Sequence, residues 1–230
     1  VFQAVPLNSA IVSGSDVWTG WQRQGTTNTY TRNWPYNWGS GSGATSTVIV
    51  RRKEMVFVNG VLLKQVLSLN NLVNETFYID EGADKIYIST GINATGAKVE
   101  VAVRSGLFII DSRQNISIKG FVFQHDNSAI DASAVRMNKV SNILVEDTDF
   151  LWNNWGGLRI NAFNNVTVRR TVANHNGGRG TEAVRGTNLL MEDNDTSDNN
   201  WRGFLGAYTG HNVAGAKHLR VHGAVYRNHI

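Results

Sequence analysis

One four-residue segment recurs along the second half of this chain at nearly fixed spacing. Four copies start at residues 115, 142, 165 and 188, so successive starts are 27, 23 and 23 residues apart, and a fifth follows after 30. The copies are Asn115–Ile118, Asn142–Val145, Asn165–Val168, Asn188–Met191 and His218–Val221. A short fixed period predicts a stacked solenoid, in which each repeat is one coil that contacts only its neighbours.

Each repeat contains three short apolar pieces separated by Gly, Asn and Asp. In one copy the pieces are Leu158–Ile160, Val166–Val168 and the segment around Val172. Apolar and polar residues alternate within them and β-branched residues are common, which is typical of strands. A unit of about 23 residues with three strands predicts an all-β fold, a single-stranded solenoid whose coils stack at roughly 4.8 Å as a parallel β-helix.

An Asn or Asp recurs eleven residues after each of the first four starts, at Asp126, Asn153, Asn176 and Asn199. Counted in the same way from residue 218, the fifth position is His229. Such a column suits a turn that needs left-handed backbone geometry or side-chain-to-backbone bonds, and stacked amides can bond along it. We therefore interpret these residues as architectural.

Composition restricts the setting of the protein. The chain has 230 residues, no cysteine and a formal net charge of +4. The absence of cysteine, with no signal-peptide or membrane-span pattern, fits a mature secreted protein, extracellular or periplasmic and bacterial, without membrane association. Acidic residues interrupt the basic positions, so we expect no nucleic-acid partner.

Residues 1–104 do not follow the repeat, and we expect them to form a small antiparallel β module packed on the solenoid of residues 105–230. Strand-like pieces include Thr47–Val50 and two hairpins, Met55–Val58 turning at Asn59–Gly60, and Phe77–Asp80 followed by Lys85–Ile88. The sequence stops within a coil. We expect the solenoid to be truncated there, with the remainder of the chain or a second chain covering the exposed end.

The chain resembles secreted bacterial proteins of the right-handed parallel β-helix, or pectate-lyase-like, superfamily. The resemblance rests on the repeats together with Val12–Trp21, Trp34–Gly39 and Glu54–Gly60, which look like the β module of β-helix glycosidase-like proteins. It implies a right-handed solenoid and a carbohydrate-active protein. The fold hosts hydrolysis, elimination, epimerisation and plain binding, so it does not select a reaction.

In this superfamily the substrate groove usually lies along one strand face. Alternation predicts that the outward column of that face contains Arg136, Arg159, Glu182 and Leu205. The arginines could bind an anionic sugar, and Arg159 beside Glu182 would favour the carboxylate as base or nucleophile. The alternative is an ordinary surface salt bridge between stacked neighbours.

A glycosidase needs a second carboxylate. It could come from a loop, from Asp131 in the longer coil, or from an acidic residue of a further coil, which the resemblance favours.

Other candidate site residues lie at corners and in loops. His175 could act as acid or base, or could simply cap a turn. Trp155 and Trp201 could stack on sugars, or could pack loops. Lys217 and Arg202 belong to a pattern similar to that of related β-helix proteins, where a Lys or Arg is the usual lyase base.

Three functions remain open. The first is a glycoside hydrolase acting on a polysaccharide or oligosaccharide, with Glu182 catalytic. The second is a polysaccharide lyase or C5-epimerase acting on a uronic-acid glycan, with Lys217, Arg202 or Arg159 as base. The third is a non-catalytic glycan-binding or adhesion protein. No cofactor is expected, although the acidic run 192–198 is a weak candidate for calcium.

Overall fold

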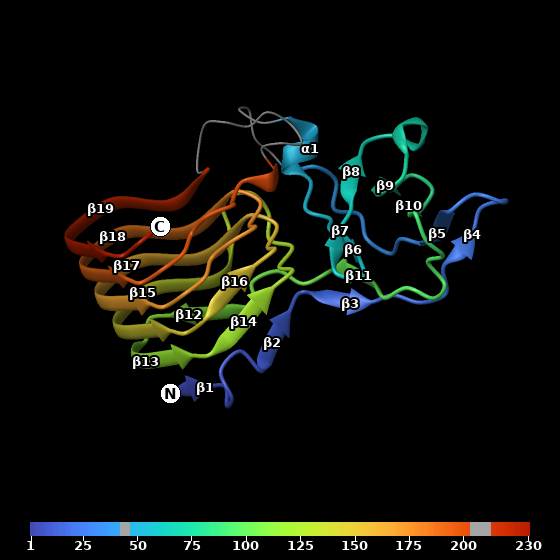
Figure 1. Ribbon diagram of the computed structural model, residues 1–230. Helices are drawn as coiled ribbons and strands as arrows, with labels where there is room; N and C mark the ends of the chain where they lie inside the picture. Colours follow the sequence, from blue (N-terminus) through green and yellow to red (C-terminus); the bar gives the residue numbers. More distant parts are fainter. Residues whose placement is uncertain (42–46, 203–212) are drawn as a thin grey trace.

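The computed structural model describes residues 1–41, 47–202 and 213–230. It contains a stack of coils and, beside the stack, a smaller group of strands (Figure 1). The N-terminus lies at one end of the stack, and the strand nearest the C-terminus lies at the other.

The coils are built on one large parallel sheet and one small one. The large sheet has the order β1-β13-β15-β17-β18-β19, with β12 also paired to β15. Its strands are β1 (Phe2–Gln3), β12 (Phe108–Asp111), β13 (Gln114–Lys119), β15 (Ser133–Glu146), β17 (Gly156–Arg169), β18 (Arg179–Glu192) and β19 (Ala214–Arg227). The small sheet contains β2 (Ala10–Ser13), β14 (Phe121–Gln124) and β16 (Asp149–Leu151), all parallel. The predicted parallel β-helix is therefore confirmed.

Each of the long strands β15, β17 and β18 bends through a corner at residues with left-handed backbone. One column of such corners contains Asn142, Asn165 and Asn188, whose φ angles are 53°, 56° and 57°. Asn tolerates this conformation better than other non-glycine residues do. The side chains also bond along the column, because Asn165 Nδ2 donates to Asn142 Oδ1 at 2.8 Å.

The second predicted column is a buried amide ladder. Asn176 Nδ2 donates to the carbonyl of Phe150 at 3.0 Å, and Asn176 Oδ1 accepts from Asn153 Nδ2 at 2.9 Å. Asn199 repeats the pattern one coil on, and Asn153 and Asn176 are completely buried. The residue with left-handed backbone is the one before each ladder residue, for example His175 with φ of 55°. The ladder residues therefore stabilise the corner through their side-chain hydrogen bonds and not through an unusual backbone conformation.

The last coil follows a register that the repeat did not predict. Leu189 pairs with Ala224 across β18 and β19, so the final step is 35 residues and not 30. Gly223, with φ of 67°, therefore occupies the corner that Asn188 occupies one coil earlier, and His218 pairs with Ala183. Compared with a coil of 23 residues, the step of 35 residues adds twelve residues before β19. The step of 30 residues that the repeat suggested would add seven.

The module contains two further sheets. One has the order β4-β5-β10-β9-β8 and the other β3-β11-β6-β7, and only the β8–β9 pairing is parallel. Their strands are β3 (Ser15–Val17), β4 (Gln22–Arg23), β5 (Thr29–Asn33), β6 (Val56–Val58), β7 (Val61–Leu62), β8 (Lys64–Val66), β9 (Thr76–Asp80), β10 (Lys85–Ser89) and β11 (Val99–Ala102), with a 3₁₀ turn, η1 (Leu69–Asn71). Both predicted hairpins are confirmed, since β6 pairs with β7 and β9 with β10.

Two segments of the N-terminal region differ from the sequence expectation. Residues 2–13 belong to the coils, because Phe2 pairs with Ile118 and Ala10 with Phe121. The chain thus enters the stack, leaves it to build the module and returns, so residue 104 is not a simple boundary. The second difference is α1 (Val48–Arg51), a single helical turn where a strand was expected, with Ile49 and Val50 packed against Trp155.

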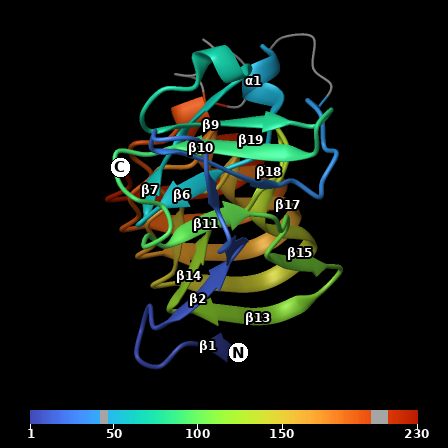
Figure 2. The ribbon, with the colours of Figure 1, turned by 90° about the vertical axis from the view of Figure 1, so that its right-hand side faces the viewer.

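The module packs on the coils through a shared apolar cluster, and it lies in front of them when viewed from its own side (Figure 2). Each part has its own apolar core, one centred on Val135, Leu158 and Val166 and the other on Trp34 and Phe77. A smaller cluster joins them, in which Met55 and Phe57 of the module contact Trp152 and Trp201 of the coils.

Candidate active site

The predicted column of side chains is present on the large sheet. Arg136 pairs in register with Arg159, Arg159 with Glu182, and Glu182 with Lys217. The residue next to Glu182 in this column is Lys217, because β19 pairs with β18 in the shifted register. Leu205, which the repeat placed there, lies outside the described residues.

Glu182 is the centre of this column. Its carboxylate Oε2 forms ion pairs with Arg159 Nε at 2.9 Å and with Arg179 Nη2 at 2.8 Å. The Glu182 side chain is only 6% exposed and that of Arg179 is fully buried. Two guanidinium groups therefore contact one oxygen of this buried carboxylate.

Arg179 was not among the predicted site residues, and strict alternation explains why. Arg179 and Glu182 are three residues apart, and a regular strand would place them on opposite faces. Strand β18 starts at Arg179, directly after the corner, and there both side chains reach the same face. Burial lowers the pKa of the Arg179 guanidinium, and the charge of Glu182 opposes that shift.

Asp131 joins the site through the same two arginines. Its backbone carbonyl accepts from Arg159 Nη1 at 2.8 Å and from Arg179 Nη2 at 3.0 Å. Its carboxylate Oδ1 lies 3.7 Å from Arg179 Nη1, and its side chain is 45% exposed. Glu182 and Asp131 thus present two carboxylates, one buried and one open to solvent, on a shared guanidinium.

Arg136 shares the column but has different surroundings. A Cβ added to Gly106 would lie 2.0 Å from Arg136 Nη2, so the guanidinium lies against the Gly106 turn. The Gly106 amide in turn donates to Asp126 Oδ1 at 2.6 Å. Arg136 therefore borders the site rather than contacting Glu182.

The two tryptophans are packing residues in this structure. Trp155 is 1% exposed and packs with Ile49 and Val50 of α1. Trp201 is half-buried in the cluster that joins the module to the coils, and the guanidinium of Arg202 lies 4.7 Å from its ring. Stacking on a sugar requires an exposed ring face, which the buried Trp155 does not offer.

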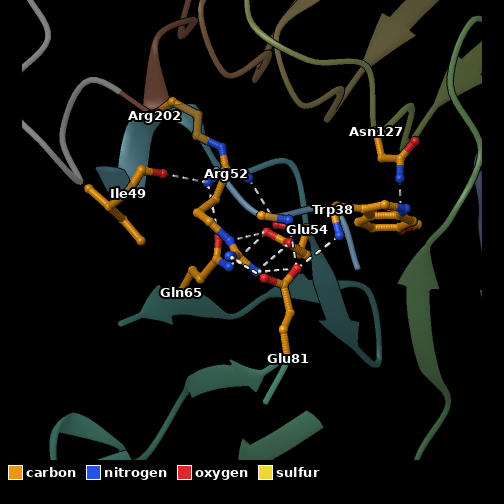
Figure 3. Close-up of polar contacts among 10 residues, drawn as sticks. Trp38, Ile49, Arg52, Glu54, Gln65, Glu81, Asn127 and Arg202 are labelled. Carbon is orange, nitrogen blue, oxygen red and sulfur yellow. Dashed lines mark hydrogen bonds and ion pairs between the residues drawn. The ribbon is translucent and has the colours of Figure 1, made fainter. Parts of the chain in front are cut away.

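Arg202 is a buried link between the module and the coils (Figure 3). Its Nη2 donates to the carbonyl of Glu54 at 2.8 Å, its Nη1 to Gln65 Oε1 at 3.2 Å, and its Nε to Asn154 Oδ1 at 2.8 Å. The side chain is fully buried, so a bound sugar could not reach it. Its donors are used within the protein and not toward a substrate.

A second part of this network surrounds Glu54. Arg52 pairs with Glu54 at 2.6 Å and with Glu81 at 3.4 Å, and Gln65 Nε2 donates to Glu54 at 2.9 Å. Glu81 Oε1 also accepts from the backbone amide of Trp38 at 2.9 Å (Figure 3). These contacts lie within the module and hold in place the Glu54 and Gln65 groups that Arg202 of the coils binds.

His175 is placed away from the groove contacts. Its ring stacks on Trp152, with centroids 4.4 Å apart, and Trp152 packs against the module. Within the described part of the chain, no hydrogen bond or ion pair joins His175 to Glu182. This position fits the alternative that His175 is a turn residue.

The described residues contain no group of three or more His, Cys, Asp and Glu side chains arranged to hold a metal ion. In the acidic run 192–198, Asp195 Oδ1 accepts from the Ser197 amide and hydroxyl, and Asn194 Oδ1 accepts from the Thr171 amide. Asp195 thus stabilises a local turn, whereas Asn194 bonds to the neighbouring coil. Among the described helices none is long and apolar enough to cross a membrane.

Comparisons with known proteins agree with this architecture. Residues 79–223, which are 145 of the 230, match the family model described as right-handed β-helix region. A search of curated protein sequences returned no match.

Two solved structures resemble the chain. XylC, in a complex with xylose, has a TM-score of 0.71 and 14% identity, over 93% of this chain and 47% of XylC. A protein described as a glycoside hydrolase has a TM-score of 0.53 and 10% identity, over 80% of this chain and 58% of the hydrolase. The chain thus spans about half the length of these structures, and at these identities the likeness shows the fold.

Proposed function

This chain belongs to the right-handed β-helix family, and from that premise we propose that it acts on carbohydrate as a glycoside hydrolase. The observation that carries the proposal is the Glu182 carboxylate, buried between Arg159 and Arg179 on the outer column of the sheet, with Asp131 on the same guanidinium. The two solved structures that share the fold, XylC with xylose and a glycoside hydrolase, support a carbohydrate substrate.

The chemistry follows from the different surroundings of the two carboxyl groups. Glycoside hydrolysis uses one carboxylate as base or nucleophile and one carboxyl group as acid. We assign the first task to Glu182 because two arginines hold its carboxylate in place. In this role Glu182 removes a proton from the attacking water or adds to the anomeric carbon. We assign the second task, protonation of the departing sugar oxygen, to Asp131 because it is the other carboxyl group that pairs with Arg179. Water is consumed and the glycosidic bond breaks.

One observation favours a second candidate, elimination or epimerisation on a uronic-acid glycan. The groove column carries three cations and one carboxylate, in the order Arg136, Arg159, Glu182, Lys217. At the other end of the same strands the outer column alternates in charge: Lys119, Glu146, Arg169, Glu192 and Arg227. Surplus positive charge suits a carboxylated sugar, and Lys217 would be the base that removes its α proton.

Product analysis separates hydrolysis from elimination. The protein is incubated with neutral and acidic polysaccharides, and the products are examined by mass and ultraviolet spectra. Hydrolysis gives fragments that have gained one water and absorb no more strongly than the substrate. Elimination gives unsaturated ends that absorb in the ultraviolet, and that result would move the base from Glu182 to Lys217.

Glu182→Gln tests the assigned residue. The change keeps the shape of the side chain and removes its charge, so we expect kcat to fall at least about a hundredfold. Glu192→Gln is the matched control, because Glu192 lies on the same strand, faces outward and pairs with Arg227 at 3.4 Å. Unchanged turnover in Glu182→Gln would remove Glu182 from the mechanism. Binding without any product would favour the non-catalytic alternative.

A further inference from the structure

The module carries a hollow of about 360 Å³ that the proposed function does not use. Trp18, Gln22, Arg32, Asn33 and Lys85 line it. They come from β4, β5, β10 and the segment before β4, at the end of the module farthest from the coils (Figure 1). Its volume falls within the range of small-ligand sites, roughly 300–1,000 Å³.

Two cations line this hollow and no carboxylate does. Within the described residues neither Arg32 nor Lys85 forms an ion pair. Arg32 Nη1 donates to the carbonyl of Thr19 at 2.6 Å, and Lys85 Nζ donates to Asn33 Oδ1 at 2.7 Å. Each of these bonds orients a cationic head group and leaves it further donors, since a guanidinium has five and an ammonium three.

The wall behind the cations is aromatic and firmly held. The Arg32 guanidinium lies 4.7 Å from the centroid of the Trp18 ring. Trp18 packs on the fully buried Trp34 at 5.8 Å and on Trp21 at 6.4 Å. Because both Trp18 and the Thr19 carbonyl hold the Arg32 guanidinium, less side-chain entropy is lost when it binds an anion.

The hollow continues into a second one of about 380 Å³, with which it shares Asn33, Pro35 and Lys85. Tyr36, Asn37 and Asp84 also line this second part. The combined surface offers amide groups, a phenol and indole edges, with both cations in the first part and the Asp84 carboxylate in the second. Amides and aromatic rings of this kind bind sugar hydroxyls and sugar faces, whereas the cations bind a negative substituent.

We propose that this hollow binds an acidic saccharide unit, a sugar that bears a carboxylate or a sulfate group. Arg32 and Lys85 hold the anionic substituent, and Gln22 and Asn33 hold hydroxyl groups of the same unit. The site is separate from Glu182, so it would retain the glycan without taking part in bond cleavage.

Calorimetric titration tests this site with three trisaccharides of equal length: a galacturonic-acid trisaccharide, a sulfated trisaccharide and a neutral one. The variants are Arg32→Gln, Lys85→Gln and the double variant. We expect the double variant to weaken binding of the acidic probes at least about tenfold, because each charge-assisted bond contributes about a tenfold factor or more. Lys64→Gln, an exposed lysine elsewhere on the module, is the control and should bind as the unchanged protein does.

The outcomes are distinct. Binding of the carboxylated or the sulfated probe that depends on Arg32 and Lys85 supports the site and identifies the anionic group. Equal binding of the neutral probe, binding that both variants retain, or no binding of either acidic probe overturns it. The readout is affinity and does not require turnover, so a failure here leaves the Glu182 proposal untouched, and loss of hydrolysis in Glu182→Gln does not affect this test.

Discussion

Arg202 places a buried positive charge between the module and the coils. Burial lowers the pKa of its guanidinium to about 9, with Glu54 opposing the shift, so it stays charged at neutral pH. Arg202→Met removes the charge and leaves the Glu54 carbonyl and the Asn154 amide oxygen without their donor. We expect the free energy of unfolding to fall by about 3–5 kcal/mol, measured by denaturant titration.

Arg113→Met is the matched control, because Arg113 is exposed and donates only to neighbouring carbonyls. We expect a change within about 0.5 kcal/mol there. If both variants lose the same stability, the Arg202 network does not hold the module on the stack.

His125 makes stability depend on pH. The ring is 5% exposed, stacks on Phe57 at 3.8 Å and bonds to the Ser15 hydroxyl at 2.9 Å. Burial lowers its pKa from 6.5 to about 4. Between these values the unfolded chain binds the additional proton, so stability is complete above pH 6.5 and declines as the pH falls to 4.

The expected loss for His125 is about 3 kcal/mol over that interval, since each pKa unit corresponds to about 1.4 kcal/mol. His218 and His229 also have lowered pKa values, so the protein is compared with His125→Asn, in which Asn tolerates the left-handed φ of 59°. Unfolding midpoints measured from pH 7 to 4 should decline less steeply in the variant. Equal slopes would show that His125 does not titrate in this range.

The candidate site was only partly predictable at the residue level. Alternation along β15, β17 and β18 correctly aligned Arg136, Arg159 and Glu182, because it depends only on the two-residue period. It could not supply Arg179, whose side chain reaches the outer face through a corner. Nor could it align Lys217, since insertion length is not encoded in the repeat.

At the level of the element, the amide ladder connects sequence to stacking. Asn176 has one side-chain donor on the Phe150 carbonyl and one on Asn199 Oδ1, and its own Oδ1 accepts from the Asn153 amide and side chain. Asn176→Ala leaves buried groups on two adjacent coils unpaired. We expect a loss of about 2–4 kcal/mol in calorimetric or denaturant unfolding.

Asn165→Ala provides the comparison for Asn176, because Asn165 belongs to the exposed corner column and donates to Asn142. Its loss should stay near 1 kcal/mol, the value of an ordinary hydrogen bond plus some corner strain. Similar losses at both positions would contradict a special role for the buried ladder.

Two elements show why the sequence-based prediction failed locally. The repeat predicted the coils because every copy has the same short-range pattern. It misaligned the last one because His218–Val221 resembles the earlier segments while pairing five residues out of step with them. Thr47–Val50 looked like a strand from its β-branched residues, yet Ile49 and Val50 form a helical turn because tertiary packing against Trp155 outweighs a weak local preference.

At the scale of the molecule, the chain combines a linear stack with a module that is fastened to it at one side. Strands β1 and β2 start the stack, and the module is built between them and β12. The junction is both apolar, through Met55 and Phe57, and polar, through Arg202 and Glu54. The module is therefore fixed relative to the coils that carry Glu182.

A stack of coils should not unfold uniformly, because each coil contacts only its neighbours. Strand β17 pairs on both sides and buries half of its residues, whereas none of the fourteen residues of β19 is buried. We expect hydrogen exchange, followed by mass spectrometry at neutral pH, to be at least about tenfold faster in β19 than in β17. Strand β18, paired to both, should be intermediate. Equal protection across the three strands would mean that the coils open as one cooperative unit.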